Sequence, residues 1–340
     1  MSLKTKKERN SSFELLRIIS MLFIVIYHLL ITVYSNNPTE IIYRGSWLPL
    51  HIGVILYVFI SGYFGIKCNI NGLCKLVGTI ALYYFPLTIY DIIRQDGNFE
   101  IKQLLFISYS PYWFIRTYLC LYLFSPVLNK YLESVGGKNR LLLIISLSFI
   151  SVYLGSSLGD SSLAGGKNLT NFCLLYVLGN TFRVYEKNFK KISFPYLISG
   201  YIVLNSVILF IFVQGGLVSK GIWFMSFPYC SPLLIINATL FFLIFTRFKI
   251  HSKIINYVAS SMFAVYLIHC QPYIANRINI TLSHSLVNDS IAINFCIVLL
   301  YAIIIMTASV LIDKILGFSF NRIKILFCSN PSNNTRQRVQ

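Results

Sequence analysis

The chain has 340 residues, of which 56% are hydrophobic and only 12% are charged. A soluble domain carries about 25% charged residues, so this composition excludes an ordinary soluble globular protein. The net charge of +18 would suit a nucleic-acid-binding protein. However, the basic residues fall on alternate loops between apolar segments, as in a membrane protein, so we expect no nucleic-acid partner.

Apolar runs of about 20 residues recur along the chain, and each is long enough to cross a hydrocarbon core of about 30 Å. The runs are continuous rather than alternating, so they predict helices and not a barrel. The first run is too long for a cleaved signal peptide and lacks a small-residue cleavage site. The sequence therefore predicts an all-α polytopic membrane protein of ten spans, at residues 12–34, 50–66, 74–93, 111–130, 141–156, 170–184, 194–213, 229–246, 254–275 and 289–313.

The basic residues predict the orientation of these spans. Of the 29 Lys and Arg residues, 21 fall in or beside the two tails and the even-numbered loops. Because Lys and Arg concentrate on the cytoplasmic side, we expect both termini to be cytoplasmic. The chain then divides into an N-terminal tail (1–11), a transmembrane domain (12–316) and a C-terminal tail (317–340), with an amphipathic interfacial helix at 98–110.

The first span, LLRIISMLFIVIYHLL, carries Arg17 and His28, 11 positions apart. An ionisable residue inside a span indicates a functional site. At a rise of about 1.5 Å per residue, Arg17 lies about 8 Å and His28 about 24 Å from the cytoplasmic edge. Two simpler interpretations stay open. Arg17 can snorkel to the interface and pair with Glu14, one helical turn before it, and His28 can complete a buried hydrogen-bond network.

Two later spans carry ionisable residues at a similar depth. Arg116 in span four and His269 in span nine each lie about 22 Å above the cytoplasmic edge. We therefore expect both to line one cavity with His28, while Arg17 reaches the cytoplasmic mouth of that cavity. Arg116 as an interface anchor beside Trp113, and His269 as part of a buried hydrogen-bond network, remain alternatives.

These residue types suit proton transfer in a dry cavity. A neutral imidazole can take a proton from a hydroxyl as that oxygen attacks a carbonyl. A guanidinium can hold a phosphate or a developing oxyanion. The eight cysteines are scattered, mostly in apolar runs, with no CxxC or Cys/His cluster, so we expect small core residues and no metal site.

Four segments then resemble the acyltransferase 3 family of integral-membrane O-acyltransferases. FELLRIISMLFIVIYH resembles its first span, whose signature is an Arg, ten residues and a His. GVILYVFISGYF (53–64) resembles its Ser-Gly-Tyr segment, and PYWFIRTYLCLYLFSPVLN (111–129) resembles its Trp-containing segment. SSMFAVYLIH (260–269) resembles its late Tyr-Leu-x-His motif. The four matches occur in the family's order.

The resemblance implies transfer of an acyl group, usually acetyl, from cytoplasmic acetyl-coenzyme A onto a sugar hydroxyl of a lipid-linked or surface polysaccharide. The donor is then a substrate, with no bound cofactor. The implied location is the bacterial cytoplasmic membrane, with membrane lipid and polysaccharide-assembly proteins as neighbours. WFIR (113–116) is similar to capsule- and O-antigen-modifying members. Many relatives add a hydrolase-like domain after the membrane domain, so here we expect the membrane domain to present the acyl group or pass it on.

Carried over to this chain, the resemblance implies roles for named residues. Arg17 and His28 become the catalytic and donor-handling pair, with His269 beside them. The tunnel lining comprises Glu14, Ser61, Gly62, Tyr63, Trp113, Arg116 and Tyr266. Ser61 can alternatively carry the acyl group covalently, and the Ser-Gly pair can simply let helices pack closely. We favour direct transfer, with His28 as the base.

Two other function classes remain open. A multipass exporter of a sugar or a lipid-linked saccharide would also place Arg and His in a cavity, with His relaying protons. The chain has no internal repeat, which counts against a transporter built from two duplicated halves. A structural partner in polysaccharide assembly needs no catalytic histidine. Loss of acyl transfer on replacing His28 distinguishes the enzyme from both.

Overall fold

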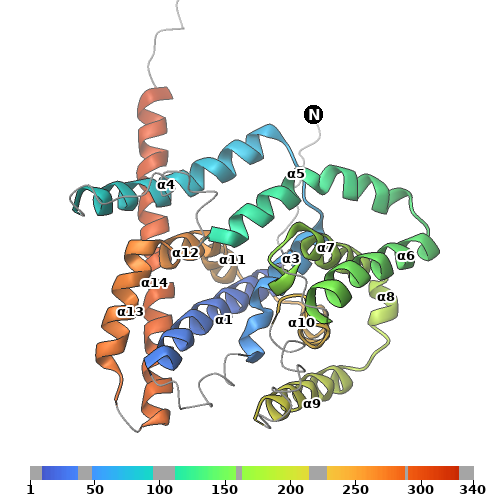
Figure 1. Cartoon of the computed structure of the whole chain (residues 1–340). Helices are drawn as coiled ribbons and strands as arrows, with labels where there is room; N and C mark the ends of the chain where they lie inside the picture. Colours follow the sequence, from blue (N-terminus) through green and yellow to red (C-terminus); the bar gives the residue numbers. More distant parts are fainter. Residues whose placement is uncertain are drawn as a thin grey trace, which may run out of the picture.

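The computed structural model describes residues 10–36, 48–94, 112–157, 163–213, 228–287 and 290–328. Throughout these residues the regular structure is helical, with no strand (Figure 1). The elements are α1 (Ser11–Asn36), η1 (Leu48–His51), α3 (Ile52–Phe64), α4 (Ile70–Arg94), α5 (Trp113–Ser134), α6 (Gly137–Ser148), η4 (Phe149–Ser157), η5 (Ala164–Gly166), α7 (Leu169–Val184), α8 (Glu186–Phe189), α9 (Phe194–Val213), α10 (Pro232–Phe245), α11 (Lys253–Ala259), α12 (Met262–His269), α13 (Pro272–Ser285) and α14 (Ile291–Cys328).

Each of the ten predicted spans is largely helical, and the all-α membrane prediction is confirmed, but predicted span nine (254–275) crosses the 81° bend between α12 and α13. Among the described residues, four helices are long and apolar enough to cross a membrane, or five if the bent pair α11–α12 and α13 is one span. Shorter apolar helices occupy predicted spans two, seven and eight. The count of ten and the cytoplasmic termini stay predictions, and 98–110 lies outside the described residues.

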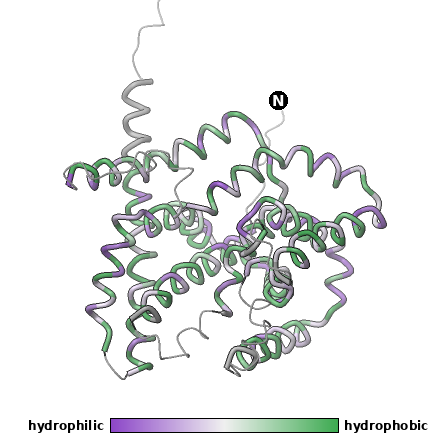
Figure 2. The backbone as a smooth tube through the Cα atoms, viewed as in Figure 1, coloured by the Kyte–Doolittle hydropathy of each residue, from purple (hydrophilic) through white to green (hydrophobic). Residues whose placement is uncertain are grey.

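Helix α1 is the centre of the molecule. It packs against α3, η1, α10, α11, α12, α13 and α14, and Figure 1 shows it running between the α13–α14 side and the α3–α7 side. Hydrophobic residues continue along the outer helices (Figure 2). On α14, Leu300, Ile303 and Leu311 are all more than half exposed. Such an apolar exterior is what contact with lipid requires.

Glycines let α3 approach its two neighbours closely. A Cβ on Gly62 would lie 2.0 Å from the carbonyl oxygen of Tyr176 in α7, and one on Gly179 would lie 2.3 Å from that of Phe59. On the other side, a Cβ on Gly53 would lie 2.7 Å from the Ser20 carbonyl oxygen in α1. Small residues at helix contacts are the usual means of close packing in membranes. They hold α3 between α1 and α7.

The chain bends by 81° between α12 and α13. Pro272 is the first residue of α13, and the Gln271 side chain caps it by accepting from the Ile274 amide at 3.0 Å. A proline at this position begins a helix readily because it has no amide hydrogen to satisfy. The bend leaves His269 as the last residue of α12 and Cys270 directly after it.

Candidate active site

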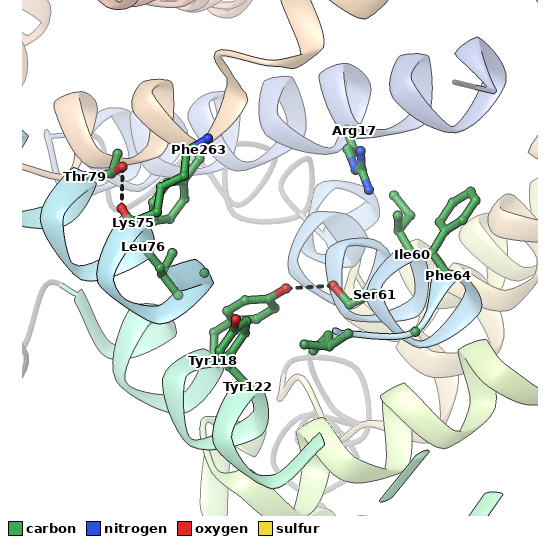
Figure 3. Close-up of a pocket in the computed structure, with 13 residues that line it drawn as sticks. Arg17, Ile60, Ser61, Phe64, Lys75, Leu76, Thr79, Tyr118, Tyr122 and Phe263 are labelled. Atoms are coloured by element: carbon green, nitrogen blue, oxygen red, sulfur yellow. Dashed lines mark hydrogen bonds between the residues drawn. The ribbon is translucent and has the colours of Figure 1, made fainter. Parts of the chain in front are cut away.

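Two neighbouring cavities lie between α1, α3, α4, α5 and α12, with volumes of about 480 and 410 Å³. The larger runs along α1 to Met21 and Ile24, and the smaller reaches Gly65 and Thr79. Figure 3 shows the smaller cavity. The two share six lining residues, drawn from all five helices: Arg17, Ser61, Lys75, Leu76, Tyr118 and Phe263.

Arg17 extends from α1 into both cavities, as Figure 3 shows for the smaller one. Its Nη1 donates to Glu14 Oε1 at 2.7 Å, and the Glu14 side chain is only 9% exposed against 33% for Arg17. The sequence-predicted Arg17–Glu14 pair is thus present. Tyr57 also donates its hydroxyl to the Arg17 carbonyl oxygen at 2.8 Å. Arg17 therefore presents an oriented guanidinium to the cavities, while one of its nitrogens is held by a buried carboxylate.

The start of α1 is tied to the segment before α11. Ser12 donates its hydroxyl to the Phe248 carbonyl at 2.7 Å and accepts from the Ile250 amide at 3.0 Å. Ser11 accepts from the Ser252 amide at 3.0 Å. These bonds satisfy backbone groups that would otherwise lie open near the helix end. They fix the position of the turn that carries Glu14 and Arg17.

Lys75 is a second cation at the cavities, and it is not among the residues that the sequence singles out. It lies in the first turns of α4 and lines both cavities with Arg17. The only sequence signal is a basic residue near the start of an apolar helix. Two cations that line the same cavities, from α1 and from α4, make this space suited to an anionic group (Figure 3).

The three residues of the Ser-Gly-Tyr segment of α3 make different contacts. Ser61 lines both cavities; its hydroxyl donates to the Tyr57 carbonyl at 2.9 Å and lies 3.2 Å from the Tyr118 hydroxyl (Figure 3). Gly62 closes against α7, as described above. Tyr63 donates its hydroxyl to Glu186 Oε2 at 2.9 Å. Of the three, Ser61 lines the two cavities described here, and the prediction that Gly62 and Tyr63 line the tunnel stays a prediction.

His28 and His269 come together from helices 241 residues apart in sequence. His28 Nδ1 lies 3.1 Å from His269 Nε2, and His269 Nδ1 lies 2.7 Å from the Val265 carbonyl oxygen. A carbonyl only accepts, so His269 Nδ1 carries the hydrogen and a neutral His269 accepts at Nε2. His28 therefore donates from Nδ1, and the lone pair of a neutral His28 is on Nε2.

The histidine pair lies one helical turn beyond the end of the larger cavity. Ile24 and Tyr266 line that cavity. They precede His28 and His269 by four and three residues, and residues at these spacings share a helix face. The Tyr266 hydroxyl is buried without a hydrogen-bond partner among the described residues. Arg17 and His28 thus occupy successive positions along α1, and His269 meets His28 from α12.

Arg116 does not join the histidines. Its side chain is exposed and lines neither of the two cavities. His28 and His269 do not line these cavities either, so one cavity shared by the three residues stays a prediction. A common depth along the membrane does not set the direction in which a side chain points. Trp113, one turn away, lies 5.1 Å ring to ring from Tyr229 and 5.2 Å from the Lys167 ammonium. Burial lowers the pKa of that ammonium.

Two further ionisable residues, the partly exposed Asp313 and the buried His51, are not among those that the sequence singles out. Asp313 of α14 accepts the hydroxyls of Tyr83 and Ser261, each at 2.6 Å, and so ties α4 and α12 to α14. His51 of η1 is 8% exposed and lies between the rings of Tyr27 and Tyr229, at 4.4 and 4.9 Å. Each sits at the end of an apolar run, where a polar residue normally indicates only the end of a span.

A family model described as an acyltransferase domain matches residues 10–314. The match begins one residue before α1 and ends inside α14, so it contains both cavities and the histidine pair. No curated protein and no solved structure matches the chain.

Proposed function

The chain belongs to the acyltransferase 3 family, and on that premise we propose that this membrane acyltransferase moves an acetyl group from cytoplasmic acetyl-coenzyme A to a sugar hydroxyl of a lipid-linked or surface polysaccharide. The observation that carries the proposal is the Val265–His269–His28 hydrogen-bonded series, one helical turn beyond a cavity lined by Arg17. It supplies a base and an anion-binding group along one helix.

The proposed reaction begins at His28 Nε2, which accepts the proton of the acceptor hydroxyl as that oxygen attacks the thioester carbonyl. The positive charge on the His28 ring is stabilised because Nδ1–H donates to His269, which is itself held by the Val265 carbonyl. The tetrahedral intermediate then expels the coenzyme A thiolate, which takes up the proton. No covalent acyl-enzyme is needed.

The proposed donor end is the part of the two cavities that Arg17 and Lys75 both line. Coenzyme A carries phosphates, and Arg17 and Lys75 both face this space. A guanidinium binds a phosphate through two parallel hydrogen bonds, whereas an ammonium acts as a point charge. We assign Arg17 to the donor phosphates, with Lys75 beside it. The acceptor then approaches His28 from the opposite membrane face, in the bacterial cytoplasmic membrane.

The contacts of Ser61 bear on whether it carries the acyl group covalently. Its hydroxyl donates to a backbone carbonyl of its own helix and lies beside the Tyr118 hydroxyl, and within the described part of the chain no histidine is among its hydrogen-bond partners. A serine nucleophile requires an adjacent base. This arrangement supports Ser61 as a lining residue and direct transfer as the route.

The deciding experiment measures label transfer from radiolabelled acetyl-coenzyme A in membranes that contain the wild-type chain or His28→Ala. We expect label in the saccharide fraction with the wild type and its loss with the variant. Saccharide export that is unchanged in rate and free of label would instead identify an exporter. Equal label transfer by both chains would contradict the proposed base.

A further inference from the structure

The bend between α12 and α13 brings a thiol to the histidine pair. Cys270 Sγ lies 3.4 Å from His269 Nε2 and 3.9 Å from His28 Nδ1, and these two nitrogens are 3.1 Å apart. The three atoms lie within 4.8 Å of one another. The sequence shows no such cluster because His28 is far from the adjacent His269 and Cys270 along the chain.

The triangle has the dimensions of one face of a zinc tetrahedron. With Zn–N of about 2.05 Å and Zn–S of about 2.3 Å, tetrahedral geometry separates two nitrogens by about 3.4 Å and a nitrogen from a sulfur by about 3.6 Å. The observed edges of 3.1, 3.4 and 3.9 Å each differ from these values by about 0.3 Å or less. A small side-chain adjustment would admit the ion.

The surroundings also suit a metal site. His269 donates Nδ1–H to the Val265 carbonyl, and a ligating histidine is usually oriented in this way through its other ring nitrogen. His269 and Cys270 are 5% and 8% exposed. A thiolate with two imidazoles selects soft divalent cations over Mg²⁺ or Ca²⁺.

We propose that His28, His269 and Cys270 form a three-ligand site for Zn²⁺, and that occupancy of this site switches the enzyme off. Three protein ligands leave the fourth position for water. On binding, the Cys270 thiol loses its proton to solvent, and the His28 proton moves from Nδ1 to Nε2 as the metal takes Nδ1. His28 then has no lone pair with which to accept a proton. The inhibitory half of the proposal rests on the proposed function, whereas the binding half does not.

The binding test uses purified full-length protein in detergent, reduced with a phosphine and stripped with a chelator. Zn²⁺ binding is measured by calorimetry, and Co²⁺ provides a cobalt–thiolate charge-transfer absorption band. The variant is Cys270→Ser. Its matched control is Cys173→Ser, since Cys173 in α7 is also buried at 5% exposure and has no histidine contact in the described structure.

We expect the wild type and Cys173→Ser to bind Zn²⁺ alike and to show the band. Cys270→Ser should bind at least about tenfold more weakly and lack the band, because it has lost its thiolate ligand. A wild type without the band, or Cys270→Ser with unchanged Zn²⁺ affinity, overturns the site.

The inhibition test measures label transfer with increasing Zn²⁺. Wild-type transfer should fall at the same concentration at which the site fills and recover on chelation, whereas Cys270→Ser should stay active at that concentration. Zn²⁺ that fills the site without slowing transfer overturns the switch. If the wild type binds Zn²⁺ at this site but His28→Ala still transfers label, the metal site stands and His28 is not the base.

Discussion

At the scale of the residue, α1 separates two kinds of chemistry along its length. Arg17 lines both cavities with its guanidinium held by Glu14. His28 contacts His269 beyond the end of the larger cavity. The two groups need different surroundings. The guanidinium must be open to an approaching anion, whereas the imidazole that accepts a proton must be shielded from water. Substitutions at these two positions should therefore change different kinetic parameters.

His28→Ala should lower kcat by about 10²-fold or more, the usual contribution of a positioned general base, with little change in donor affinity. Steady-state kinetics with acetyl-coenzyme A and a saccharide acceptor, in the presence of a chelator, measure both. A variant that keeps near-normal turnover at saturating donor and acceptor would rule out His28 as the base.

Arg17→Lys should raise the KM for acetyl-coenzyme A more than it lowers kcat. Lysine keeps the charge but cannot make two parallel hydrogen bonds to a phosphate. The same kinetics with dephospho-coenzyme A derivatives give the control, since the penalty should shrink when the phosphate that Arg17 contacts is missing. A loss confined to kcat would place Arg17 in the chemical step instead.

At the scale of the element, the site depends on close packing and on a break in a helix. Gly62 and Gly179 allow α3 and α7 to touch through their backbones, which orients Ser61 toward the cavities. Asp313 holds Ser261 at the start of α12, and Gln271 with Pro272 ends the same short helix after His269. α12 is therefore fixed at both ends, and His269 is presented at a defined angle to α1.

Gly62→Ala should destabilise the protein by about 1–3 kcal/mol, because the added methyl meets the Tyr176 carbonyl oxygen, a backbone atom that cannot move aside alone. The readout is the apparent Tm of the detergent-solubilised protein. The matched control is Gly78→Ala in α4, where a Cβ meets no described atom within 4 Å. An unchanged Tm for Gly62→Ala would contradict the packing described here.

At the scale of the whole molecule, the apolar exterior and the distribution of basic residues both bear on how the protein lies in the membrane. Exposed Leu and Ile side chains on α14 suit lipid, and the basic residues beside the even-numbered loops predict which face lies inside. The proposed mechanism requires this orientation, since coenzyme A comes from the cytoplasm and Arg17 lies near the N-terminal end of α1.

The topology is therefore testable directly. A reporter fused after residue 340 should be active when it is of a kind that functions in the cytoplasm, and inactive when it requires export. The same fusion after residue 285, in the loop before α14, should give the opposite result. Activity of an exported reporter at the C-terminus would refute the ten-span arrangement and, with it, the direction of donor entry.

Much of this protein follows from the sequence alone, because the physics concerned is local or one-dimensional. Long continuous apolar runs can satisfy their backbone in lipid only as helices, and the spacing of Arg17 and His28 along α1 follows from the helical rise. The order of four motifs identified the family, and Glu14 pairs with Arg17 because three residues separate them on one helix.

Only the tertiary structure decided which side chains meet. The helical rise per residue gives the depth of a side chain in the membrane but not the direction in which it points around the helix. It therefore could not distinguish His269, which contacts His28, from Arg116, which is exposed at a similar predicted depth. Nor could it place Cys270 beside both histidines or bring Lys75 to the cavities that Arg17 lines. These contacts depend on how α1 packs against helices more than 200 residues away or across a cavity, and on a bend after His269, so no local pattern encodes them.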